Sequence, residues 1–103
     1  VPRLPARLVC GGANNQLATP EVGTLLADRG ILFAPDFLVN CGGVIQVAEE
    51  LAGGDLDRAR ARTARVYETT RRVLDRAAAE GVTPVMAAEQ EAEERILRAA
   101  EAT

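Results

Sequence analysis

Two short apolar runs decide the fold of this chain: Arg7-Leu8-Val9-Cys10-Gly11-Gly12 and Ile31-Leu32-Phe33-Ala34. Each run is apolar throughout instead of alternating, which is typical of a strand buried on both faces of a sheet. The first ends at a glycine pair, and the second stops at Pro35, which has no N–H to donate into a sheet. The segment between them predicts a helix, so the order strand, helix, strand predicts an α/β fold with two parallel strands and a right-handed crossover helix.

The crossover helix carries start and stop signals. Thr19 is the expected N-cap, Pro20 stands at the expected first helical position, and Gly30 follows Arg29 where a left-handed residue ends many helices. We expect a loop over residues 35–40 and then further helices. One carries Val44, Val47, Ala48 and Leu51 on one face and ends at Gly53-Gly54; two long ones start at the N-caps Asp55 and Thr83.

Two parallel strands do not make a stable open sheet, because parallel sheets are built from several strands covered on both faces. Either partners complete this sheet or an upstream part is missing. The dinucleotide-binding fingerprint GxGxxG is also absent, since neither Gly11-Gly12 nor Gly42-Gly43 has its spacing.

Composition excludes several chemistries. The chain has 103 residues and a formal net charge of -3, with no His and no Lys, so every basic residue is Arg. Without Lys there is no Schiff base, and without His no side chain has an ordinary pKa near neutrality. Cys10 and Cys41 are two lone thiols far apart in sequence, so we expect no metal site.

Partners and compartment follow from charge and from the chain start. A slightly acidic chain predicts no binding to nucleic acid or anionic membrane, and no apolar run approaches the roughly 20 residues of a spanning helix. The start, Val1-Pro2-Arg3-Leu4-Pro5, has no apolar core of a signal peptide. Two cysteines without a framework suit a reducing compartment, so we expect a cytoplasmic protein.

Three features favour structural roles over chemical ones. The arginines of residues 58–76 are interleaved with acids, which predicts a solvated helix face and not a nucleic-acid surface. The acids Glu89, Glu91, Glu93 and Glu94 are expected on the wet side of the last helix. Cys41 stands beside a glycine pair at a helix start, but no His accompanies it, so we expect a packed small residue and not a nucleophile.

Three asparagines follow the two strands. Asn14 and Asn15 stand beyond the carboxyl end of the first strand, and Asn40 stands beyond that of the second. Ligands of open α/β sheets bind in the crevice at this edge, and an amide offers both a donor and an acceptor. Asparagines also form turns in loops, so the residues alone leave both interpretations open.

Three motifs in order carry a family resemblance: Gly12-Ala13-Asn14-Asn15-Gln16-Leu17, Gly30-Ile31-Leu32-Phe33-Ala34-Pro35-Asp36-Phe37 and Asn40-Cys41-Gly42-Gly43-Val44-Ile45-Gln46-Val47-Ala48-Glu49-Glu50-Leu51. They closely resemble the carboxyl-terminal part of the glutamate/leucine/phenylalanine/valine dehydrogenases, most closely the leucine and valine enzymes. Residues 92–96 extend the likeness to the tail. Cys41 departs from the family's usual Ala, a small change that we expect to be tolerated.

The resemblance implies NAD-dependent oxidative deamination of an L-amino acid to a 2-oxo acid and ammonia. It implies a cofactor site at Gly12, Ala13, Asn14 and Asn40, and a substrate site at Asn40, Val44 and Val47. Glutamate-specific relatives carry Ser at the position of Val47, where it bonds the distal carboxylate. A Val side chain has no hydrogen-bond donor for a carboxylate. We therefore expect branched-chain aliphatic substrates: valine, leucine or isoleucine.

The resemblance also implies that this chain is a piece of a larger enzyme. Residues 1–54 are then the carboxyl-terminal half of a Rossmann-type NAD(P)-binding domain, and residues 55–103 are helices that pack back towards the substrate domain. The family's catalytic Lys and Asp residues lie in the absent amino-terminal domain, so no catalytic residue is expected here and the chain alone is expected to be inactive. We expect a homo-oligomer. The alternative is a non-catalytic helical interaction or regulatory module derived from such a domain.

Overall fold

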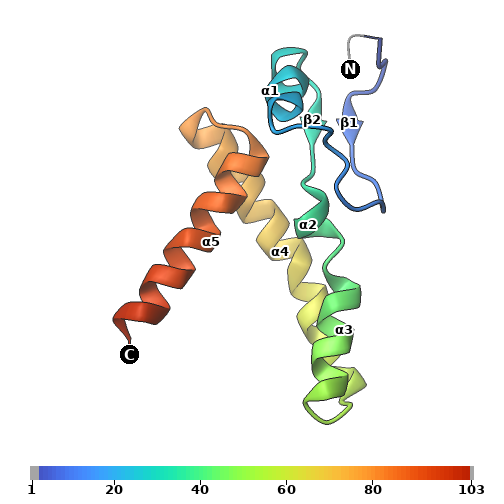
Figure 1. Cartoon of the computed structure of the whole chain (residues 1–103), viewed down its shortest axis with the longest axis vertical. Helices are drawn as coiled ribbons and strands as arrows, with labels where there is room; N and C mark the ends of the chain where they lie inside the picture. The colour runs from blue at the N-terminus through green and yellow to red at the C-terminus, as the bar shows by residue number, and fades with distance from the viewer. Residues whose placement is uncertain (1–2, 103) are drawn as a thin grey trace.

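The computed structural model describes residues 3–102, so the outer ends of the two predicted domains, residues 1–2 and 103, lie outside it. The chain is mainly helical, with one small sheet beside α1 at one end of the molecule (Figure 1). Its elements in order are β1 (Leu8–Val9), α1 (Glu21–Asp28), β2 (Leu32–Phe33), α2 (Asp36–Val39), α3 (Gly42–Leu51), α4 (Leu56–Glu80) and α5 (Pro84–Glu101).

The predicted strand, helix, strand unit is confirmed. β1 and β2 are parallel, with Leu8 opposite Leu32 and Val9 opposite Phe33. The N–H of Leu32 donates to the carbonyl oxygen of Arg7 at 3.0 Å, and the N–H of Ala34 donates to that of Val9 at 2.9 Å. The crossover between the strands contains α1, which packs on β2.

The sheet is covered on one face within the described residues. Leu26 of α1 packs in a buried cluster with Ile31 and Phe33, and Val9 lies against it. The opposite face carries Leu8 and Leu32, which are paired in register and about half exposed. A parallel sheet with a bare apolar face agrees with the expectation that something further covers it.

The helix ends mostly lie where the sequence signals place them. Gly30 follows α1 with φ 70°, a left-handed conformation that Gly adopts without steric cost. Asp55 accepts a hydrogen bond from the N–H of Arg58 at 3.1 Å, and Thr83 accepts one from the N–H of Met86 at 3.2 Å. Thr19 is different: α1 begins at Glu21 with the preceding residue as N-cap, so Thr19 caps no N–H with its side chain.

The prediction of a loop over residues 35–40 is wrong in its centre, where α2 forms a single helical turn. Pro35 precedes an acid there, so the local sequence repeats the Pro-then-acid start of α1. Leu38 of this turn packs on the core between α4 and α5. A lone turn is too short for a helical period, which explains why the periodicity did not reveal it.

The long helices diverge from a shared core. Val73 and Ala77 of α4 pack with Ala87 and Ala88 of α5, while α3 lies along the other half of α4 (Figure 1). Several large side chains of α4 are exposed, notably Leu56 and Tyr67, because no other element within residues 3–102 covers them. The end of α5 stands away from α4, and its Ile96 and Leu97 are likewise exposed.

Ion pairs tie α4 to α5. Arg72 Nε lies 2.6 Å from Glu91 Oε1, and Arg76 Nη2 lies 2.7 Å from Glu94 Oε1. Arg76 lowers the pKa of the Glu94 carboxyl, and the pKa of Arg76 is raised by its hydrogen bonds to Glu94 and Glu80. The expectation that all four acids of this helix lie on its solvent-exposed side is therefore wrong for Glu91, whereas Glu94 is exposed although it pairs with Arg76. None of the helices described is long and apolar enough to cross a membrane.

Candidate functional site

The candidate site lies at the carboxyl edge of the sheet. Parallel strands end at the same edge, so the loop after β1 and the segment after β2 emerge side by side. The first contains residues 10–16, and the second leads through α2 to residues 40–43 at the start of α3. The sequence places its candidate cofactor residues on the first segment and Asn40 on the second.

Asn40 joins these two segments. Its Nδ2 donates to the carbonyl oxygen of Gly11 at 2.9 Å and weakly to that of Ala13 at 3.4 Å. The structure therefore brings Asn40 and the β1 loop together, as expected of residues that share a site. Within residues 3–102 nothing donates to Asn40 Oδ1, which leaves this oxygen as an acceptor.

Neighbouring side chains fix the β1 loop in place. Gln16 Nε2 donates to the carbonyl oxygen of Ala13 at 2.8 Å, and the N–H of Asn15 donates to Asp36 Oδ2 of α2 at 2.9 Å. Asn15 has φ 53°, a conformation that Asn tolerates better than most residues. Of the two open interpretations, the turn-forming one applies to Asn15.

The remaining residues of the β1 loop face outward. Gly12, Ala13 and Asn14 are exposed, and a Cβ added at Gly12 would meet no heavy atom within 4 Å. The side chain of Asn14 makes no hydrogen bond within the described part of the chain. This stretch therefore offers an open backbone and an unpaired amide to a ligand.

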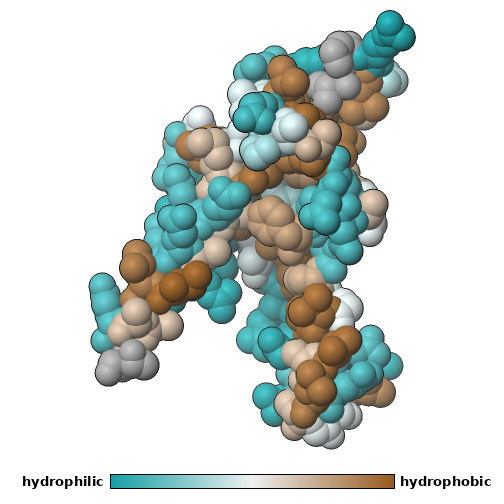
Figure 2. All heavy atoms as spheres, viewed as in Figure 1, coloured by the Kyte–Doolittle hydropathy of each residue, from teal (hydrophilic) through white to brown (hydrophobic). Residues whose placement is uncertain are grey.

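One face of α3 presents aliphatic side chains to the surface. Val44, Val47 and Leu51 are 73%, 54% and 87% exposed, and hydrophobic atoms cover this end of the molecule in Figure 2. Positions i, i+3 and i+7 share one helix face, as the sequence predicts. Side chains of this kind are normally buried, so an exposed row of them indicates a surface that meets something apolar.

The opposite side of α3 holds a carboxylate that sequence reasoning missed. Glu49 is 4% exposed and is the single buried charged residue in the part of the chain that is described. Its Oε1 accepts from Arg62 Nη1 of α4 at 2.8 Å, and its Oε2 lies 3.6 Å from Arg58 Nε. The sequence does not separate Glu49 from Glu50, its exposed neighbour, because the packing of α4 on α3 decides which of the two is buried.

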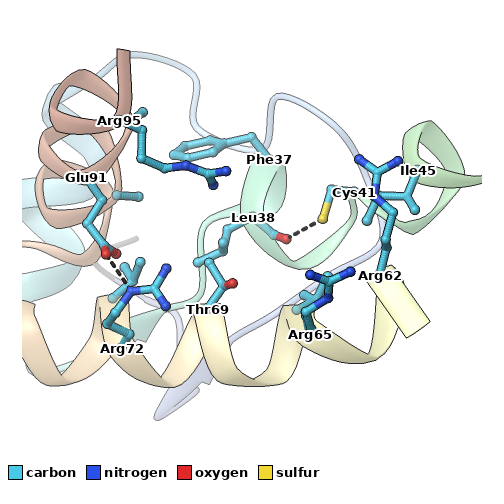
Figure 3. Close-up of a pocket in the computed structure, with 14 residues that line it drawn as sticks. Phe37, Leu38, Cys41, Ile45, Arg62, Arg65, Thr69, Arg72, Glu91 and Arg95 are labelled. Carbon is cyan, nitrogen blue, oxygen red and sulfur yellow. Dashed lines mark hydrogen bonds and ion pairs between the residues drawn. The ribbon is translucent and has the colours of Figure 1, made fainter. Parts of the chain in front are cut away.

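Cys41 has a structural place. Its Sγ donates to the carbonyl oxygen of Leu38 at 3.1 Å at the end of α2, as Figure 3 shows. Both cysteines are unpaired, and only Cys10 is fully exposed. These observations agree with a packed small residue, and no group of three potential metal ligands exists within residues 3–102.

Behind Cys41 lies a groove that the sequence did not reveal. It has a volume of about 390 Å³ and runs between α2, α4 and α5 (Figure 3). Phe37 and Leu38 line its apolar part, and arginines of α4 and α5 line its rim. The carboxylate that lines it, Glu91, is bonded to Arg72 through Oε1, whereas its Oε2 is buried without a hydrogen-bond partner within the described residues.

Comparison with known proteins identifies the family. The sequence profile of the Glutamate/Leucine/Phenylalanine/Valine dehydrogenase family matches residues 3–103. The chain belongs to this family. Among its relatives, valine dehydrogenase of Streptomyces albus is 56% identical over 96% of this chain and 27% of its own length. Leucine dehydrogenase of Bacillus cereus is 41% identical over 93% of this chain and 26% of its own length.

A solved dehydrogenase has the same fold. L-tryptophan dehydrogenase from Nostoc punctiforme superposes with a TM-score of 0.89 at 38% identity, over 94% of this chain and 30% of that one. The family resemblance stated from the motifs is thus confirmed, with valine, phenylalanine and leucine dehydrogenases among the relatives. The chain spans about a quarter of the length of the curated dehydrogenases it matches.

Proposed function

We propose that this chain is the carboxyl-terminal part of an NAD-dependent amino-acid dehydrogenase that deaminates branched-chain aliphatic L-amino acids to 2-oxo acids and ammonia. One observation carries the proposal. The exposed aliphatic face of α3, with Val44 and Val47, begins next to Asn40, whose amide is bonded to the β1 loop. We propose that this face contacts the aliphatic side chain of the substrate and that the β1 loop binds the cofactor, with Asn40 between them.

We propose that the chain contains parts of two structural units. Residues 1–54 form the carboxyl-terminal half of a Rossmann-type cofactor domain, and residues 55–103 form helices that pack towards a substrate domain. Two features support this division. The bare face of the sheet at Leu8 and Leu32 is what an incomplete cofactor domain exposes, and the uncovered Ile96 and Leu97 of α5 suit a helix that packs on a further domain.

The β1 loop fits a dinucleotide cofactor. The open space at Gly12 lets a ligand approach the backbone, while Ala13 adds no bulk and Asn14 offers an unpaired amide. We assign Gly12, Ala13, Asn14 and Asn40 to the NAD site. NAD, when bound, accepts the hydride from the amino acid's Cα.

The substrate side of the proposal rests on Asn40, Val44 and Val47. Asn40 Oδ1 accepts a hydrogen bond from the substrate's amino group, while its Nδ2 stays on the β1 loop. Val44 and Val47 contact the aliphatic side chain. Seating a glutamate carboxylate against them would desolvate it without a partner, at a cost of several kcal/mol.

Proton transfer must come from elsewhere in the enzyme. The chain has no Lys and no His, and Arg72 holds the one carboxylate, Glu91, that lines the groove behind Cys41. We therefore propose that the chain alone is inactive and acts within a larger, homo-oligomeric enzyme whose ligands are small molecules. The extensive pairing of the α4 arginines supports the absence of a nucleic-acid partner. The unpaired cysteines suit the cytoplasm.

A chimeric enzyme tests the proposal. In it, this chain replaces the matching segment of Streptomyces albus valine dehydrogenase, which is 56% identical. We expect amino-acid-dependent NADH formation with valine, leucine or isoleucine, and little with glutamate. A folded chimera that fails to reduce NAD with any aliphatic amino acid, or that prefers glutamate, would overturn the proposal.

A further inference from the structure

Glu49 is a charged residue that the proposed function does not use, yet it is almost fully buried. We propose that it is a positioning residue: its bonds to α4 set the rotation of α3 and thereby aim the aliphatic face at the substrate. This inference rests on the proposed function, because it concerns the orientation of that same site. It assigns a role in substrate selection to a residue that touches no substrate.

Glu49 lies on the side of α3 away from the aliphatic face. A helix advances about 100° per residue, so Glu49 lies roughly 140° around the axis from Val44 and about 160° from Val47. The exposed fractions agree with these angles, since Glu49 is 4% exposed and Val44 is 73% exposed. Any rotation that shifts the carboxylate therefore shifts the valines through the same angle.

Apolar packing alone does little to fix the angle of α3 about its own axis relative to α4. The contact side of the helix is built from small or partly buried residues: Gly42 faces Thr63, where an added Cβ would lie 3.4 Å from Cγ2, and Ile45 is partly buried. Such a smooth contact resists sliding and turning less than interlocking large side chains do. A directional bond is needed to select one angle.

The Glu49 carboxylate supplies that directional bond. Arg62 Nη1 donates to one oxygen at 2.8 Å, and Arg58 Nε approaches the other at 3.6 Å, one helical turn away on α4. Figure 3 shows Arg62 rising from α4 towards Ile45 of α3. Rotating α3 away from these guanidiniums would leave a buried carboxylate without a partner, which is strongly unfavourable.

The consequence for the site follows from helix geometry. Side-chain ends lie about 5 to 6 Å from a helix axis, so a rotation of about 20° displaces them by roughly 2 Å. Displacements of about 1 Å at a reacting site change rates by up to about a hundredfold. Loss of the Glu49 bonds is therefore expected to alter which aliphatic side chain fits the pocket.

The test compares Glu49→Gln with Glu50→Gln in the full-length chimera described above. Glu50 is the exposed neighbour, and its carboxylate accepts a weak hydrogen bond from Gln46 Nε2 at 3.4 Å. We expect Glu49→Gln to change the ratio of kcat/KM for leucine to that for valine by about tenfold, with the KM for NAD unchanged. Glu50→Gln is expected to leave the ratio as it was.

Arg62→Gln provides a second variant in case Glu49→Gln folds poorly. It should shift the ratio in the same direction, and the double variant should shift it no further than either single one, because both remove one bond. A lowered Tm with an unchanged ratio in both single variants would overturn the positioning role. If the unmodified chimera is inactive, the proposed function itself fails, so the two failures are distinguishable.

Discussion

The side-chain amide of Asn40 donates a hydrogen bond to the carbonyl oxygen of Gly11 at a distance of 2.9 Å. The two residues belong to segments that follow different strands, so this bond joins the two halves of the proposed site. In the proposed site, Asn40 Oδ1 contacts the substrate while Nδ2 holds the β1 loop. On this proposal, one side chain sets both the shape of the loop and the position of the substrate contact.

Asn40→Asp tests this double role. The substitution places carboxylate oxygens against the carbonyl oxygens of Gly11 and Ala13, where a donor is required. In the full-length chimera we expect kcat/KM for the amino acid to fall by about a hundredfold and the KM for NAD to rise, as measured by steady-state kinetics. Asn15→Gly is the matched control. The bond of Asn15 is from its backbone and its φ is 53°, so that variant should keep its activity. An active Asn40→Asp enzyme would contradict the assignment.

Gly12→Val tests the cofactor loop. A Cβ added at Gly12 meets no heavy atom within 4 Å, and the backbone there is not left-handed, so we expect the fold to accept the valine with little change in Tm. The new side chain fills the space that we assign to the cofactor. We expect the KM for NAD to rise at least about tenfold, with a smaller effect on the amino acid. Equal KM values for NAD in the unmodified chimera and the Gly12→Val variant would show that Gly12 does not belong to the cofactor site.

Val47→Ser tests the selection of aliphatic substrates. The hydroxyl gives a carboxylate a donor and removes apolar contact, so the preference for valine over glutamate should fall by about tenfold or more. Comparing kcat/KM for valine with kcat/KM for glutamate, both from rates of NADH formation, measures this preference. The unmodified chimera should use glutamate very poorly. Good turnover of glutamate before the substitution would show that Val47 does not line the pocket.

The sequence predicted most of the fold because its signals are local. The caps at Asp55 and Thr83, the left-handed Gly30 and the two apolar runs each depend on neighbours in the chain. The short turn α2 was missed because it forms to seat Leu38 on a core made by distant helices. The cap at Thr19 was misplaced by one residue, an ordinary error at a helix end.

Some features of the candidate site could be recognised only from the three-dimensional structure. The strand order placed Asn40 at the same sheet edge as the β1 loop, and the bond to Gly11 shows how the two are joined. The burial of Glu49 was not visible in the sequence, since its neighbour Glu50 is also acidic and is exposed. The partner helix decides which of the two is buried. The same is true of Glu91, which faces Arg72 instead of solvent.

The pairing of Arg76 with Glu94 predicts a pH dependence. The folded pKa of Glu94 is lowered from 4.5, so the pair contributes stability above pH 4.5 that is lost as the pH falls through the lower folded pKa. Glu94→Gln should therefore lower the Tm slightly at neutral pH, by a few degrees at most because the pair is solvent-accessible, and the difference should vanish in acid. Glu93→Gln, at an exposed neighbour without an ion pair in the described structure, is the control. A difference in Tm that persists well below pH 4.5 would contradict the assignment of this pair.

We propose that this chain supplies the cofactor loop after β1 and the aliphatic face of α3, and that catalysis needs a further domain. The most direct measurement is NADH formation from L-valine and NAD by this chain, alone and co-expressed with the portion of Streptomyces albus valine dehydrogenase that it does not match. The account predicts no activity from either part alone and activity from the two together. Activity of the chain alone would contradict it, as would an inactive pair when the Streptomyces albus enzyme's own matching segment restores activity under the same conditions.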